Sequence, residues 1–151
     1  MRNEQPILLI EDDRVDAMTV KRALRELGAA NQVIHTTDGE QALEYLRNED
    51  NQLPCAILMD LNMPRMTGME FLQIIATEEL FKNIPVVVMS TSNEPKEVDD
   101  ISRLGACRYI VKSVDYGQFV EALRAVEQLW NSTELAAAAP NRTSSGPMMP
   151  Y

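Results

Sequence analysis

The stretch CAILMDLNMPRMTGMEFLQII, residues 55–75, decides the fold that we predict for this chain. It begins with five apolar residues, 55–59, in which polar and apolar side chains do not alternate. A short strand of this kind is buried on both faces, as in parallel sheets covered by helices on both sides. The strand runs into Asp60 and a turn segment, and apolar residues at helical spacing follow. The stretch therefore predicts one strand–turn–helix unit.

Four further short runs are predicted strands, and most of the five are continuously apolar, as residues 55–59 are. They cover residues 7–10, 33–36, 86–89 and 109–111. Each strand is followed by a segment whose apolar residues recur every three or four positions, the last of them spanning 116–130. Parallel strands need crossover connections, so five β-α units in succession predict a doubly wound α/β sheet with helices on both faces.

The expected helix starts and ends carry capping residues. Three pairs place a short oxygen side chain three residues before a glutamine or glutamate: Asp38 with Gln41, Thr67 with Glu70, and Asp115 with Gln118. Asp13, three residues before Asp16, is a further expected cap. Gly28 and Gly105 are expected to end the first and fourth helices, where a positive φ is useful.

The composition is that of one globular domain. The chain has 151 residues, of which 45% are hydrophobic, and its formal net charge is −9 at pH 7. An acidic surface repels phosphate backbones, so we expect no nucleic-acid partner. The apolar runs are too short for a membrane span or a signal peptide, so we expect no membrane association and a cytoplasmic location.

The character of the chain changes after Trp130. We predict one α/β domain over residues 1–131 and a C-terminal tail over 132–151, where an alanine run precedes several prolines. From residue 140 onward the composition favours disorder. For residues 135–139, disorder and an arm that orders on a partner chain stay equally open.

Polar side chains follow four of the five predicted strands. Glu11 and Asp12 follow the first strand, Asp60 the third, Ser90 the fourth and Lys112 the fifth. Functional groups in an open parallel sheet gather beyond the carboxyl ends of the strands, so these side chains should converge. Three carboxylates in one site cannot all ionise without a cation. Mg²⁺ suits a few carboxylates and water, and we predict a Mg²⁺ site there.

Four segments together resemble the receiver domain of two-component response regulators. They are LLIEDD (8–13), ILMDLNMPRMTG (57–68), VVVMSTS (86–92) and YIVK (109–112). The resemblance implies a flavodoxin-like receiver with the strand order 2-1-3-4-5. It also implies a phosphoacceptor signalling protein rather than an enzyme. Such a protein accepts a phosphoryl group from a sensor histidine kinase onto an aspartate, with Mg²⁺, and then changes its protein contacts.

The resemblance also implies a role for particular residues. It implies that Asp60 is the phosphoacceptor. For the metal, it implies that Asp12 is a direct ligand, that Glu11 acts through metal-bound water, and that the backbone carbonyl of Asn62 completes the contacts. It further implies that Ser90 is the hydroxyl residue, that Lys112 pairs with the acceptor and then with the phosphoryl oxygens, and that Tyr109 is the aromatic switch position. The chemistry is sound without the resemblance, because a carboxylate oxygen can attack a phosphoryl group and form an acyl phosphate.

A narrower resemblance is to the stand-alone regulators paired with bacterial and cyanobacterial phytochrome-type histidine kinases. It rests on residues 127–130 with the tail that follows, and on Ser113 after Lys112, where the family usually has a proline in a cis peptide. A non-proline cis bond costs ~2.5–4 kcal/mol, so the geometry of this peptide stays open.

This narrower resemblance implies a homodimer through the fourth helix, fifth strand and fifth helix. The segment 116–130 holds more large apolar residues than one narrow stripe needs, and the surplus is either stripe edge or interface. Trp130 is accordingly either a core-edge side chain or a dimer anchor.

Other functions are less consistent with the sequence. A Mg²⁺-dependent aspartyl-phosphate phosphatase commonly has a second aspartate two residues after the nucleophile, where this chain has Asn62. A pseudo-receiver that only binds a partner has no need of Asp60 and Lys112. A nucleotide-binding flavodoxin-type protein would have a glycine-rich phosphate loop after the first strand, which this sequence lacks.

The two cysteines and the one histidine are expected to be structural. Cys55 and Cys107 belong to strands two positions apart in the expected order, roughly 9–10 Å from each other, beyond the reach of a disulfide. We therefore expect two free thiols. His35 lies in a short strand with no obvious nucleophile beside it.

Overall fold

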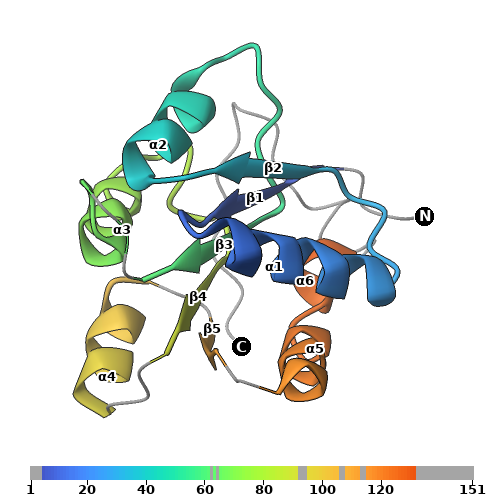
Figure 1. The fold of residues 1–151 in the computed structure, drawn as a ribbon. Coiled ribbons are helices and arrows are strands. Elements are labelled where there is room, and N and C mark those ends of the chain that lie inside the picture. The colour runs from blue at the N-terminus through green and yellow to red at the C-terminus, as the bar shows by residue number, and fades with distance from the viewer. Residues whose placement is uncertain are drawn as a thin grey trace.

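The computed structural model describes residues 5–61, 63, 65–91, 95–105, 108–112 and 115–131. In it, five strands alternate with helices along the chain (Figure 1). The strands are β1 (Ile7–Ile10), β2 (Val33–Thr36), β3 (Ala56–Asp60), β4 (Val86–Ser90) and β5 (Arg108–Val111). The helices are α1 (Arg14–Glu26), α2 (Gly39–Arg47), α3 (Gly68–Ala76), α4 (Pro95–Arg103), α5 (Tyr116–Arg124) and α6 (Gln128–Asn131).

The strands form one parallel sheet in the order β2-β1-β3-β4-β5, which confirms the predicted topology. The register is continuous across the sheet: Ile7 pairs with Val33 on one side and with Ala56 on the other. β1 and β2 have the predicted bounds. The other three strands differ by one residue at one or both ends, because β3 runs from Ala56 to Asp60, β4 ends at Ser90 and β5 begins at Arg108. All five carboxyl ends therefore lie along one edge of the sheet.

The sheet separates two hydrophobic cores. Successive strand residues point to opposite faces, so Ile7 and Leu9 pack in one core while Leu8 and Ile10 pack in the other. The first core lies under α1, α5 and α6, and the second under α2, α3 and α4 (Figure 1). Since both faces are covered, the central strands can be apolar throughout, which is the pattern that predicted them.

The predicted capping interactions are present. The Asp13, Asp38 and Asp115 carboxylates accept hydrogen bonds from backbone N–H groups in the first turns of α1, α2 and α5. Thr67 and Glu70 form a complete capping box at α3. Gly28 and Gly105 have φ values of 79° and 101°, which confirms that both helix ends use the left-handed region.

The fifth helical segment differs from the prediction. The sequence predicts one helix over residues 116–130, but α5 ends at Arg124 and α6 begins at Gln128. Backbone hydrogen bonds between residues three apart, such as Leu129 N to Val126 O, tighten the chain in this region. This tightening turns Val126, Leu129 and Trp130 into the first core.

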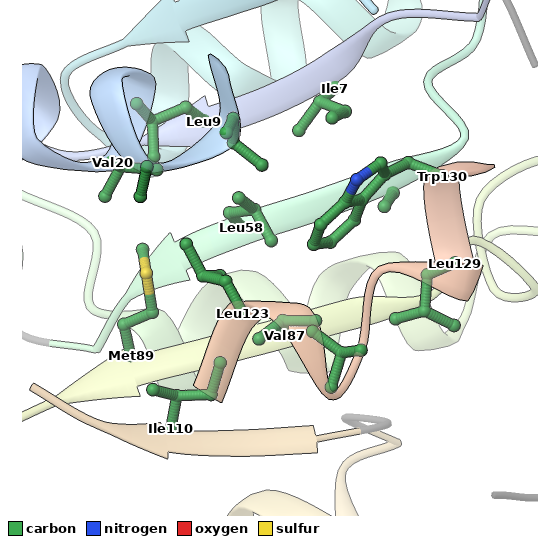
Figure 2. Close-up of a cluster of buried hydrophobic side chains, with 14 of the residues drawn as sticks. Ile7, Leu9, Val20, Leu58, Val87, Met89, Ile110, Leu123, Leu129 and Trp130 are labelled. Carbon is green, nitrogen blue, oxygen red and sulfur yellow. The ribbon is translucent and has the colours of Figure 1, made fainter. Parts of the chain in front are cut away.

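Trp130 is a core residue. Its side chain is 1% exposed and lies beside Ile7 and Leu129 in the first core (Figure 2). Phe119, Val120 and Leu123 of α5 are also buried in this core. The apolar surplus of this segment is therefore used inside the domain, and the dimer-anchor interpretation of Trp130 is wrong for this structure.

Cys55 is buried and its thiol is free, and burial raises the pKa of that thiol to about 12. Cys107 lies outside the described residues. The His35 ring donates a hydrogen bond from Nε2 to the backbone carbonyl of Glu11 at 2.8 Å, which is consistent with the structural role that we expected. Among the described residues, no helix combines the length and the apolar character that crossing a membrane requires.

Candidate functional site

Three carboxylates meet at the carboxyl edge of the sheet. Glu11 and Asp12 follow β1, and Asp60 ends β3, the strand next to it. One oxygen from each of the three side chains lies within 4.8 Å of the others. Glu11 is fully buried and Asp60 is 7% exposed, whereas Asp12 is exposed. The predicted convergence of these acids is confirmed.

Lys112 brings a positive charge to the same place. Its backbone N–H donates to the Ser90 carbonyl, which fixes the residue at the ends of β4 and β5. Its Nζ donates to Glu11 Oε1 at 2.8 Å and lies 3.5 Å from Asp60 Oδ1. The Lys112 side chain is only 17% exposed, so one half-buried ammonium neutralises part of the acidic cluster.

The cluster brings together three carboxylates and one ammonium group, so negative charge is in excess. Burial raises the pKa of Glu11 to about 7, and the charge of Asp60 acts in the same direction, although the hydrogen bond from Lys112 opposes both. Burial alone would lower the pKa of Lys112, but its hydrogen bonds to the neighbouring carboxylates outweigh burial, and the pKa lies above its ordinary value. Lys112 is thus a permanent cation, and a second cation beside Glu11 would favour the ionised form of that carboxyl.

The residues present fit a hard divalent cation. Carboxylate oxygens are the ligands that Mg²⁺ prefers, and an exposed ligand such as Asp12 leaves room for bound water. Asn62, whose backbone carbonyl was expected as a further ligand, lies outside the described residues, as do Pro64 and Ser113. The described part of the candidate metal site is therefore Glu11, Asp12 and Asp60.

The loop that follows Asp60 is held by a tight backbone contact. Gly68 donates its N–H to the Leu61 carbonyl at 3.0 Å. A Cβ at Gly68 would lie 2.9 Å from that carbonyl oxygen and 3.0 Å from Leu61 Cα. Only glycine fits against the backbone of Leu61, the residue after Asp60, so Gly68 helps to shape this loop.

Ser90 lies at the carboxyl end of β4, as the sequence predicted, and Tyr109 lies near the start of β5. Ser90 ends β4 and is fully buried. Tyr109 lies on β5 opposite Val88, is partly buried, and packs against the second core. The roles of both residues in switching stay predictions.

Asp16 is a neighbour of the site that the sequence prediction did not include. It lies in the first turn of α1, and its Oδ2 accepts a hydrogen bond from Lys112 Nζ at 3.0 Å. The sequence carries no specific signal for this contact, because an aspartate in the first turn of a helix is an ordinary feature of helix starts.

Comparison with known proteins identifies the family. Residues 7–124 match the family model described as the response regulator receiver domain. The chain is 31% identical over 137 residues to response regulator Rcp1 of a Synechocystis species, which covers 88% of this chain and 93% of that protein. It is also 31% identical over 127 residues to a probable methanogenesis regulatory protein, FilR2, of Methanothrix harundinacea, which covers 82% of each chain.

Solved structures give the same result. The phosphorylated cyanobacterial phytochrome response regulator RcpA superposes with a TM-score of 0.77 at 32% identity, covering 84% of this chain and 94% of that one. The Mn²⁺-bound form of Rcp1 superposes with a TM-score of 0.76 at 31% identity, covering 85% and 96%. Sheet order, acidic cluster and sequence matches agree, and this chain belongs to the response regulator receiver family of two-component signalling.

Proposed function

We propose that this chain is a stand-alone response regulator that accepts a phosphoryl group onto Asp60 with the help of Mg²⁺. The observation that carries the proposal is the meeting of three carboxylates and one half-buried lysine at the carboxyl edge of the sheet. Glu11 and Asp60 are both buried, but of the three acids Asp60 is the one that comes directly before Leu61, whose backbone Gly68 contacts.

The chemistry follows from these positions. An Asp60 oxygen attacks the phosphorus of the donor, a P–O bond to Asp60 forms, and the bond to the donor group breaks, leaving an acyl phosphate. Glu11, Asp12 and Asp60 would hold Mg²⁺, whose charge would offset the negative charge on the phosphoryl oxygens. The Lys112 ammonium pairs with another of these oxygens, and the Ser90 hydroxyl donates a hydrogen bond to the incoming group.

The output is a change of protein contacts rather than a chemical product. Ser90 must turn toward the phosphoryl group, which leaves space that Tyr109 can fill from β5. This couples the phosphorylated state of Asp60 to the surface formed by α4, β5 and α5. The protein is then a signalling protein that also assists its own phosphorylation and dephosphorylation, in the cytoplasm and without a nucleic-acid partner.

The proposed phosphoryl donor is a sensor histidine kinase. A phytochrome-type kinase is supported by the structural similarity to a regulator described as a cyanobacterial phytochrome response regulator. The proposed domain covers residues 1–131, and 132–151 form a tail. A homodimer also stays a proposal. Since the large apolar residues of α5 are buried, contact through this face would use Val111, which is 41% exposed, and polar side chains.

A labelling experiment tests the proposal. The wild-type protein is incubated with a small phosphoryl donor such as phosphoramidate, with Mg²⁺ or with EDTA, and intact mass gives the number of phosphoryl groups per chain. We expect one group with Mg²⁺ and none with EDTA. Asp60→Asn should take up none, while Asp38→Asn, which changes a buried aspartate that caps α2, should be labelled as the wild type is. Equal labelling of Asp60→Asn and wild type would contradict the assignment.

A further inference from the structure

The ammonium group of Lys112 is shared among three carboxylates rather than held by Asp60. Its Nζ lies 2.8 Å from Glu11 Oε1, 3.0 Å from Asp16 Oδ2 and 3.5 Å from Asp60 Oδ1. An ammonium has three N–H donors, and two of them are used by Glu11 and Asp16. Lys112 therefore gives its two shortest contacts to Glu11 and Asp16, and Asp60 is the most distant of the three carboxylates.

The position of Asp16 is well determined by its own helix. Its backbone N–H donates to the Asp13 carboxylate at 3.0 Å, in the cap that begins α1. Its side chain is 45% exposed, so this carboxylate reaches Lys112 from the solvent side of the cluster. Glu11 approaches the same ammonium from the fully buried side. The two acids together set where the ammonium lies.

Phosphorylation of Asp60 would change the balance of these contacts. A phosphoryl group brings up to two negative charges and three strong acceptor oxygens to Asp60. The ammonium would then gain more by moving toward Asp60 than by staying on a half-exposed carboxylate. If Lys112 leaves, Asp16 loses its cation and stays close to a newly added negative charge. Both the loss of its ion pair with Lys112 and its repulsion from the phosphoryl group make Asp16 raise the free energy of the phosphorylated state.

We propose that Asp16 is a positioning residue that holds Lys112 in a resting place and raises the free energy of the phosphorylated state. This inference rests on the proposed function, because it concerns the phosphoryl group on Asp60. Asp16 acts through Lys112 and makes no bond to the reacting atoms. The exchange of Lys112 from Asp16 to the phosphoryl oxygens is the step that Asp16 controls.

The test measures the affinity of full-length protein for beryllofluoride, a phosphoryl mimic, at fixed Mg²⁺. Asp16→Asn should bind it more tightly than wild type by about two- to fivefold, the range that a half-exposed ion pair supports. Asp16→Glu keeps the carboxylate and should bind more weakly than Asp16→Asn. Asp99→Asn removes an exposed charge that pairs with Arg103 on α4, and it should match the wild type.

The outcomes separate this inference from the proposed function. A gain in affinity cannot come from damaged folding, so tighter binding by Asp16→Asn alone supports the inference. If wild type binds beryllofluoride but Asp16→Asn binds equally or more weakly, the role of Asp16 is refuted while the proposed function stands. An equal gain in Asp99→Asn would also refute it, because the effect would then be one of net charge. A wild type that binds no beryllofluoride in the presence of Mg²⁺ would overturn both.

Discussion

In the absence of a divalent cation, replacing Asp60 by asparagine should make this protein more stable. The Asp60 carboxylate lies within 4.8 Å of oxygens from Glu11 and Asp12, and 3.5 Å from Lys112 Nζ. With an effective dielectric constant of about 20, each repulsion costs ~3.5 kcal/mol and the attraction contributes ~5 kcal/mol. The net repulsion on Asp60 is then ~2 kcal/mol. Partial protonation of Glu11, whose pKa is about 7, reduces it further.

We therefore expect Asp60→Asn to raise the free energy of unfolding by ~1–2 kcal/mol in EDTA. Urea denaturation at a pH above the pKa of Glu11 measures the difference. Mg²⁺ should stabilise wild type more than the variant, because the variant has lost one ligand and much of the repulsion that Mg²⁺ relieves. The control is Asp38→Asn, a buried aspartate outside the cluster, which should show no gain. An Asp60→Asn variant that is less stable than wild type in EDTA would refute the reasoning.

Three further predictions concern stability. Gly68→Ala should lower the free energy of unfolding by ~1–3 kcal/mol in denaturant titrations, because the new Cβ meets the Leu61 backbone; unchanged stability would show that the loop relaxes freely. Trp130→Ala should lower the free energy of unfolding by ~3–5 kcal/mol in the same titrations, because the indole is buried in the first core. The control Val15→Ala changes a side chain that is 70% exposed, and its free energy of unfolding should stay within ~0.5 kcal/mol of wild type. A small loss for Trp130→Ala would restore a surface role for this residue. The pKa of Glu11 is raised from 4.5 to about 7, so its contribution to stability is present below pH 4.5 and is lost as the pH rises through 7. In thermal melts, the metal-free protein should lose stability over this pH range, and Glu11→Gln should lose less. Equal losses of stability with pH in wild type and Glu11→Gln would contradict the pKa shift.

The parts of the fold that the sequence predicted are those determined by local chemistry. β1 and β3 are apolar throughout because both of their faces are covered, and this composition is visible without the structure. The caps at Asp38 and Thr67 use residues three positions apart, so sequence spacing is sufficient to find them. The convergence of Glu11, Asp12 and Asp60 followed from the rule that parallel strands end at one edge.

The parts that sequence analysis missed depend on contacts between distant segments. The break between α5 and α6 accompanies the burial of Leu129 and Trp130 in the first core, and nothing in residues 116–130 alone marks it. The contact between Asp16 and Lys112 joins residues 96 positions apart. A carboxylate on the first turn of α1 is an ordinary feature of a helix start, so its second contact is visible only in three dimensions.

The most direct test of the central claim is to locate the phosphoryl group on the wild-type chain. The protein is phosphorylated with phosphoramidate and Mg²⁺, the acyl phosphate is reduced with borohydride, which converts a phosphorylated aspartate to homoserine, and peptides are sequenced by mass spectrometry. The account predicts homoserine at position 60, in the peptide that contains Met59 and Leu61, and at no other aspartate. Homoserine at Asp12 or Asp13, or a phosphoryl group that survives reduction on a serine or threonine, would contradict it.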